Sequence, residues 1–231
     1  MLSTLLQRHQ PFQPVVLYDP LQDKLLPMDF TAANTALTPE ILDDVQLFSD
    51  YVAKELAHHH CRFGVGGYAE HRTIYARSTH FDTGEEPRRL HLGVDIWGPA
   101  GTPVFAPLNG EIHSFRFNDQ HGDYGATIIL RHQLEGFTFH TLYGHLSLTD
   151  LKDLQDGQKI AAGQQIAQFG NIEENGHWPP HLHFQLIIDM EGLQGDYPGV
   201  CQYSKREQYL SNCPDPDLIL QMVTPSSYPH V

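Results

Sequence analysis

Apolar and polar positions along this chain follow two different periods, one helical and one typical of strands. Between Thr38 and Ala57 apolar side chains recur every three or four positions, and Thr38-Pro39 is a favourable helix start. The recurring residues are Ile41, Val45, Phe48, Val52 and Leu56. The pattern predicts one amphipathic helix over about residues 39–57. Residues 1–37 contain turn formers and no sustained period, so an irregular lead-in is expected there.

From about Thr73 onward the chain has the pattern of a mainly β protein. Short runs of β-branched and aromatic residues are separated by turn formers. Asn109-Gly110 and Glu135-Gly136 predict hairpins, and Asp156-Gly157 and Ala162-Gly163 predict turns around two short strands. Past residue 188 the chain is rich in Gly, Pro and Asp. We therefore expect an N-terminal accessory segment (1–72), a β domain (73–188) and an irregular C-terminal extension packed on that domain (189–231).

Composition narrows the classes of function. With 40% hydrophobic and 18% charged residues among 231, the chain is expected to fold as a globular domain. Fourteen basic against 28 acidic residues give a formal charge of −14, which argues against nucleic-acid or anionic membrane partners. Residues 1–18 lack an unbroken apolar export segment, so a cytoplasmic location is expected. Cys61, Cys201 and Cys213 fit no zinc ribbon or redox spacing and are expected to be reduced thiols; a Cys201–Cys213 bridge would require export.

Sixteen His residues direct attention to metal chemistry, because neutral imidazole is a common metal ligand. His91 and Asp95 are four positions apart, and in a flat strand they would stand about 13 Å apart at roughly 3.3 Å per residue. A bend at Leu92-Gly93 would bring them together, with His91 on a loop and Asp95 at the start of a strand. Taken alone, this pair is a weak signal, and a surface His near a surface Asp is the more common outcome.

His181 and His183 lie two positions apart in an apolar run, so a strand would direct both to one face. They could line one cavity or simply face solvent. His145 follows a Gly at the end of another expected strand and by itself suggests only a structural His. Together, His91, Asp95 and one of the His pair make the three-ligand nitrogen and oxygen set of catalytic zinc, and the other two His remain for proton transfer.

Several ordered motifs resemble the lysostaphin-type zinc metallopeptidases, the M23 peptidase family. They are His-Leu-Gly-Val-Asp-Ile (91–96), Pro-Ala-Gly-Thr-Pro-Val-Phe-Ala-Pro (99–107), Leu-Tyr-Gly-His-Leu-Ser (142–147), Gly-Gln-Lys-Ile-Ala-Ala-Gly-Gln-Gln-Ile-Ala (157–167) and His-Leu-His-Phe (181–184). The resemblance implies an antiparallel β sandwich with a long groove across one sheet. It also implies zinc bound by His91, Asp95 and His183, with His145 and His181 as catalytic residues that assist a zinc-activated water in cleaving a peptide or other amide bond.

The departures from the family pattern bear on the substrate. Trp178 stands near the motif where small residues are usual, either as core packing or as an exposed binding platform, and Gln185 replaces the more usual Glu. Similar modules resemble parts of longer chains with aminotransferase and kinase-like domains, which points toward small-molecule metabolism rather than cell-wall turnover. A small amide metabolite is therefore a second candidate substrate. The sequence also leaves open a phosphocarrier, in which His91 would carry phosphate, and a non-catalytic metal-stabilised binding module. The oligomeric state is not indicated by the sequence.

Overall fold

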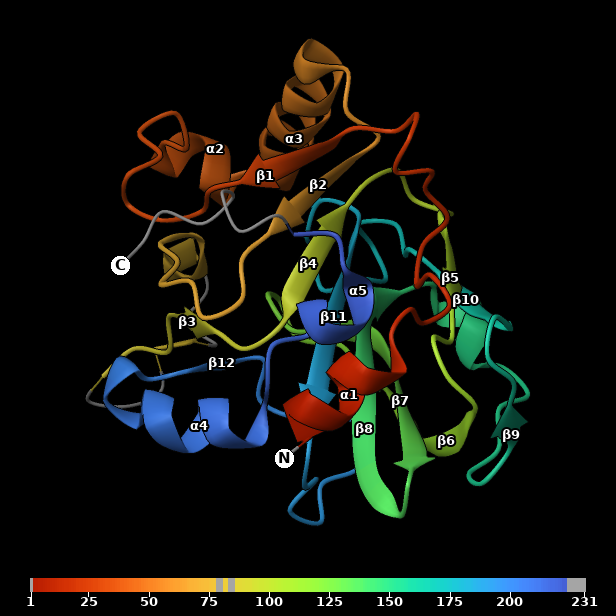
Figure 1. Ribbon diagram of the computed structural model, residues 1–231. Coiled ribbons are helices and arrows are strands. Elements are labelled where there is room, and N and C mark those ends of the chain that lie inside the picture. Colours follow the sequence, from red (N-terminus) through yellow and green to blue (C-terminus); the bar gives the residue numbers. More distant parts are fainter. Residues whose placement is uncertain (1, 78–80, 83–85, 224–231) are drawn as a thin grey trace.

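The computed structural model describes residues 2–77, 81–82 and 86–223, and it is built around one eight-stranded sheet (Figure 1). In the order in which they pair, its strands are β1 (Leu25–Met28), β2 (Phe63–Gly66), β4 (Val94–Trp97), β11 (His181–Ile187), β8 (Phe137–Leu146), β7 (Gly125–Leu134), β6 (Gly110–Asn118) and β9 (Lys159–Ile160). All neighbours are antiparallel except β1 and β2. The mainly β fold predicted from the sequence is confirmed, and the sheet is mixed because of the β1–β2 pair.

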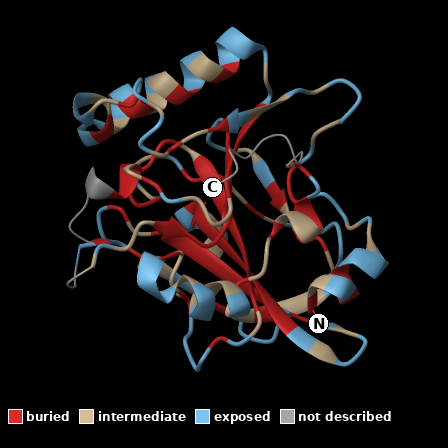
Figure 2. Ribbon diagram, turned by 60° about the vertical axis from the view of Figure 1, so that its left-hand side comes forward, coloured by how far each residue is buried: buried red, intermediate tan, exposed pale blue. Residues whose placement is uncertain are grey.

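Two small sheets accompany the large one. β5 (Pro103–Phe105) pairs with β10 (Gln165–Gln168), and β3 (Leu90–His91) pairs with β12 (Val200–Cys201). Val104 of β5 and Ala167 of β10 belong to the same buried apolar cluster as Ile128 and Phe184 of the large sheet. Figure 2 shows that the central strands are buried along most of their length. The core therefore lies between the large sheet and the β5–β10 pair.

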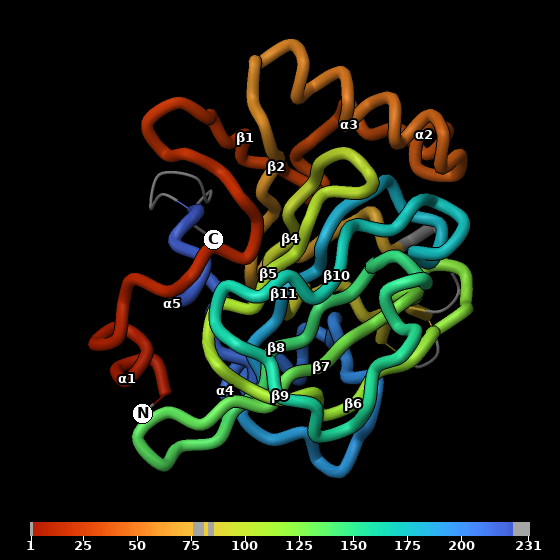
Figure 3. Tube along the Cα trace, turned by 90° about the vertical axis from the view of Figure 1, so that its right-hand side faces the viewer, coloured from red at the N-terminus to blue at the C-terminus, as the bar shows by residue number. Residues whose placement is uncertain are grey.

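The N-terminal region is more regular than expected. The prediction of an irregular lead-in over 1–37 is wrong, because α1 (Leu2–His9) and β1 form there. Leu2, Leu5 and Leu6 of α1 are buried in the main core, so tertiary packing stabilises a helix that is too short to be stable alone. Helix α1 lies beside α5 (Asp217–Leu220), near the other end of the described chain (Figure 3).

The helix predicted over 39–57 is divided into α2 (Pro39–Asp43) and α3 (Val45–His59). Asp44 has extended backbone angles, and its carboxylate accepts hydrogen bonds from the backbone N–H groups of Gln46 and Leu47. It is therefore the N-cap of α3, whereas Thr38 makes no capping bond with its side chain. Asp44 interrupts the helix but leaves the spacing of the apolar residues unchanged, so that spacing alone does not indicate the break.

One of the two predicted hairpins is present. Glu135 and Gly136 have φ values of 49° and 81° and connect β7 to β8 in an antiparallel pair, as predicted. The hairpin at Asn109-Gly110 is wrong, because β5 pairs with β10 while β6 pairs with β7 and β9. The Asn109 side chain instead accepts a hydrogen bond from the backbone of Ala162. The Asp156-Gly157 and Ala162-Gly163 turns precede β9 and β10, as expected.

The C-terminal extension does pack on the β domain, but it is not wholly irregular. It contains β12, α4 (Arg206–Asn212) and α5. Three 3-10 helices, Ile74–Arg77, Leu148–Leu151 and Tyr203–Lys205, complete the elements of the described chain. Met190, Tyr197 and Cys213 are buried against Leu142 and Ile187 of the large sheet. Residues 190–213 therefore cover the sheet face that also carries His181 and His183.

Within the described residues, no helix has the length and apolar character needed to cross a membrane. All three Cys residues are free thiols, as the sequence predicted, and two of them are buried.

Candidate metal centre

The local backbone around His91 brings it close to Asp95. Strands β3 and β4 are separated by Leu92-Gly93, which is the predicted bend, although His91 ends a short strand instead of lying on a loop. In the large sheet Asp95 pairs directly with His183. A Cβ atom on Gly93 would lie 2.5 Å from His183 Cε1, so only glycine permits this close approach.

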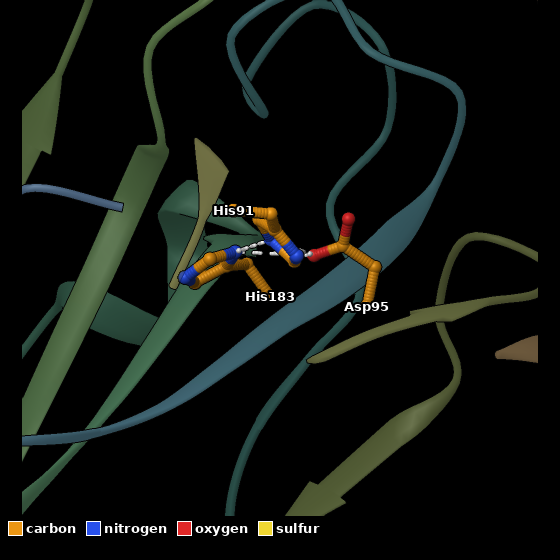
Figure 4. Close-up of side chains that lie close together, drawn as sticks. All are labelled: His91, Asp95 and His183. Atoms are coloured by element: carbon orange, nitrogen blue, oxygen red, sulfur yellow. Dashed lines mark hydrogen bonds and ion pairs between the residues drawn. The ribbon is translucent and has the colours of Figure 1, made fainter. Parts of the chain in front are cut away.

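His91, Asp95 and His183 form a compact buried cluster (Figure 4). His91 Nε2 lies 3.0 Å from His183 Nδ1, and Asp95 Oδ1 lies 3.1 Å from His183 Nδ1 and 3.3 Å from His91 Nε2. The outer ring nitrogens have their own acceptors, Gly67 O at 2.9 Å for His91 and Gln185 Oε1 at 2.8 Å for His183. When the outer nitrogens carry the protons, the inner ones present lone pairs together with one carboxylate oxygen. The donor set fits zinc.

The electrostatics of the cluster favour metal binding. Burial lowers the pKa of His91 to about 4, which keeps its imidazole neutral at neutral pH. Burial opposes ionisation of Asp95, but His91 and Arg72 together hold the pKa of that carboxyl well below its usual range. A neutral imidazole and an ionised carboxylate are the protonation states that zinc ligation requires.

His145 and His181 lie beside this cluster with their ring centroids 4.1 Å apart. Each Nδ1 atom is 2.7 Å from a backbone carbonyl oxygen, that of Asn175 for His145 and that of Pro179 for His181. The Nε2 atoms are therefore the proton acceptors. Burial, reinforced for His145 by the neighbouring His181, lowers both pKa values, to about 4 for His181.

A cavity of about 230 Å³ reaches four of the five predicted residues: Asp95, His145, His181 and His183. Its remaining wall is strongly aromatic. The aromatic lining residues are Tyr75, Phe81, Trp97, Tyr124, Trp178 and Tyr197. Trp178 is only 3% exposed, so it packs within this wall and is not an exposed platform. The cavity is a small, largely apolar chamber with the candidate site at one side.

Arg72 and Tyr124 also reach the site and were not found from the sequence. Arg72 is fully buried and donates a hydrogen bond to Asp95 Oδ2. The Tyr124 hydroxyl lies 3.5 Å from His183 Nε2, and burial raises the pKa of Tyr124 well above its usual value. No spacing or motif signal distinguishes either residue in the sequence. The assignment of ligands and catalytic residues among the five predicted positions stays a prediction.

The fold and the buried donor set together define a zinc metallopeptidase-type domain. Residues 89–194 match peptidase family M23. The resemblance inferred from the motifs is thereby confirmed. Zinc is the cofactor of this domain, and the cluster of His91, Asp95 and His183 is consistent with its site.

Known relatives match part of the chain. The chain is 32% identical over 142 residues to the peptidoglycan DD-endopeptidase ShyA of Vibrio cholerae. This match covers 56% of the chain and 30% of the relative. It is 34% identical over 101 residues to the DD-carboxypeptidase/endopeptidase Mpg of Neisseria meningitidis, covering 44% of this chain and 21% of the relative. The solved catalytic domain of lysostaphin from Staphylococcus simulans is 27% identical, with a TM-score of 0.37, and the match covers 54% of this chain and 81% of that domain. The chain thus spans less than a third of the length of these two curated relatives.

Proposed function

We propose that this protein is a zinc-dependent hydrolase that cleaves a peptide or other amide bond. The observation that carries the proposal is the buried cluster of His91, Asp95 and His183 beside two further imidazoles with available Nε2 atoms. Three nitrogen and oxygen ligands leave a coordination position open for chemistry, whereas structural zinc sites use four.

Zinc bound at the cluster would supply Lewis acidity for amide hydrolysis. The protein's own contribution is proton handling at fixed positions. Because the Nδ1 atoms of His145 and His181 donate to backbone carbonyls, each ring can accept a proton at Nε2 and return it to the departing amine. The high pKa of Tyr124 keeps its hydroxyl protonated, so it can donate a hydrogen bond to a substrate oxygen. Aromatic side chains line much of the cavity wall and make the surroundings of the site largely apolar.

The substrate we propose is short, either a small peptide or a small amide. Two covered regions support this proposal. Residues 190–213 cover the sheet face beyond His183, where Ile187 and Leu142 are fully buried. On the other side, Phe30 and Phe48 pack on Trp97. Since the names of two relatives specify DD-peptidase activities, short D-amino-acid peptides are the first substrates to test.

The phosphocarrier hypothesis has little support. His91 is 0% exposed, and both of its ring nitrogens have partners, Gly67 O on one side and the cluster on the other. A phosphoryl-carrying His must offer a nitrogen to a partner protein. The proposed hydrolase uses all five predicted residues, whereas a phosphocarrier would use only His91.

The decisive experiment is a hydrolysis screen on purified, zinc-loaded protein. The substrates are D-alanine dipeptides and tripeptides, oligoglycines and N-acyl amino acids, with Asp95→Ala as the inactive control. We expect release of an amine from at least one class, loss of activity on chelation and recovery on adding zinc. A protein that holds one zinc per chain and hydrolyses none of them would support the non-catalytic binding module. A wild-type protein that binds no zinc would contradict the proposed function.

The cytoplasmic location stays a prediction of the sequence. Cell fractionation with detection of the native protein tests it, and recovery outside the cytoplasm would contradict it.

A further inference from the structure

Arg72 contacts the candidate zinc site through Asp95 and lies outside the stretch that matches the family. Its side chain is 0% exposed, and a buried guanidinium is costly unless its donors find acceptors. Here Nη1 donates to Asp95 Oδ2, and Nε donates to Glu70 Oε2 at 2.6 Å. Nη1 also lies 3.2 Å from the Tyr75 hydroxyl. The guanidinium thus links two carboxylates in a fixed geometry.

This contact separates the roles of the two Asp95 oxygens. Oδ2 is taken by Arg72, while Oδ1 is the oxygen within 3.1 Å of His183 Nδ1 and 3.3 Å of His91 Nε2. Figure 4 shows Oδ1 directed at the two imidazoles and the other oxygen directed away from them. The terminal torsion of an Asp side chain is broad, so a carboxylate without such a partner samples other orientations.

We propose that Arg72 is a positioning residue that holds Asp95 with a single oxygen facing His91 and His183, and that Glu70 keeps Arg72 in place. The inference rests on the proposed zinc site. The same segment also orients His91, because Gly67 O accepts the hydrogen bond of His91 Nδ1. Residues 67–72 therefore support two of the three predicted ligands from outside the family stretch.

A positioning role and a purely electrostatic role for Arg72 predict opposite changes in zinc affinity when its charge is removed. A positive charge beside a site for a dication weakens binding, so if Arg72 acted only through its charge, Arg72→Met would bind zinc more tightly. If Arg72 acts by orienting Asp95, the same variant binds zinc more weakly. The charge of Arg72 is also offset by Glu70, which leaves orientation as the larger effect.

The test compares zinc binding in Arg72→Met, Arg72→Lys and a matched control, Arg62→Met. Arg62 makes a hydrogen-bonded ion pair with Asp23 at 3.0 Å, away from the proposed ligands, so the control removes an Arg–Asp contact at a more exposed position. Zinc affinity is measured on metal-free protein by competition with a chromophoric chelator. The visible spectrum of the cobalt-substituted protein reports the ligand geometry, and thermal unfolding reports stability.

We expect Arg72→Met to lower zinc affinity by about 10- to 100-fold and to alter the cobalt spectrum, as is usual when a partner of a metal ligand is removed. Arg72→Lys keeps the charge but lacks the planar fork, so it should bind zinc with intermediate affinity. Arg62→Met should match the wild type in both readouts.

Wild-type affinity and an unchanged cobalt spectrum in folded Arg72→Met would overturn the inference, as would tighter binding. If Arg72→Met does not fold, Arg72→Lys decides in the same way: weaker binding with a changed spectrum supports positioning, and wild-type behaviour overturns it. Failure of the wild type itself to bind zinc would instead overturn the proposed function.

Discussion

The separate roles predicted for His181 and His183 can be tested by one pair of substitutions. The two residues share strand β11 and the same face of it, and they are almost equally buried, at 2% and 3% exposure. His181→Ala and His183→Ala therefore remove the same side chain from equally buried positions of one strand, although His181 stacks on Trp97 and His183 contacts Asp95. Differences in zinc content or rate between folded variants report the roles of the rings.

The expected magnitudes follow from the contacts of each ring. His183 Nδ1 is within about 3 Å of both other predicted ligands, and zinc sites with four protein ligands bind with about 10–16 kcal/mol. An even share is about 2.5–4 kcal/mol per ligand, so His183→Ala should weaken zinc binding by about 100- to 1,000-fold. The Nδ1 atom of His181 bonds the carbonyl of Pro179 instead. His181→Ala should keep zinc but lose about two to four orders of magnitude in rate.

The assay combines metal analysis after dialysis, chelator competition and hydrolysis of the best substrate from the screen. Circular dichroism establishes that both variants are folded. His145→Ala should behave like His181→Ala, and Asp95→Ala like His183→Ala. If His181→Ala lost zinc while His183→Ala retained it, the two assignments would be reversed. If all four variants retained zinc and activity, the site would lie elsewhere.

Three further predictions concern pH and backbone geometry. Because burial lowers the pKa values of His91 and His181 to about 4, activity should persist at pH 5.5 and fall as the pH approaches 4; a rate profile with half-loss near 6.5 would contradict this. Burial also lowers the pKa of His132 to about 4, so the unfolded chain binds its proton first, and about 3 kcal/mol of stability present above pH 6.5 should be lost as the pH falls to 4. Urea unfolding of wild type and His132→Gln should show a shallower acid loss in the variant, and equal losses would refute the assignment. Gly176→Ala should destabilise the protein by about 3 kcal/mol or more, since the added Cβ would lie 1.8 Å from the Asp123 carbonyl oxygen. Gly101 has a similar positive φ but open space around it, so Gly101→Ala should cost about 1 kcal/mol in the same urea unfolding measurement. Similar losses of stability in the two variants would contradict the clash.

The parts of the fold that could be predicted depend on local chemistry. The Glu135-Gly136 hairpin follows from two adjacent positive φ angles, and the common face of His181 and His183 follows from the strand period. The Asn109-Gly110 prediction failed because the same dipeptide can join strands that pair with other partners. Local sequence describes a turn, but it does not specify which strands pair across it.

In the candidate site too, only the contacts between residues close in sequence could be predicted. His91 and Asp95 could be connected by the bend because they are close in sequence, and the structure does place their side chains together. Arg72 and Tyr124 reach the cluster from other segments, 23 residues before Asp95 and 59 before His183 respectively. Nothing near them in the sequence indicates which acceptor they face, so only the tertiary structure reveals them.

The N-terminal segment (1–72) contributes contacts to the site and does not only cover it. Trp97 stacks on His181 with ring centroids 3.9 Å apart, and its other contacts include Phe30 and Phe48 from that segment. Without the segment Trp97 would lose the aromatic packing that fixes the stacked ring. Asp95 would also lose its bond to Arg72, and the outer nitrogen of His91 would lose its backbone acceptor. An isolated 89–194 segment would therefore contain every predicted ligand but lack the contacts that orient them, because the preceding residues supply those contacts.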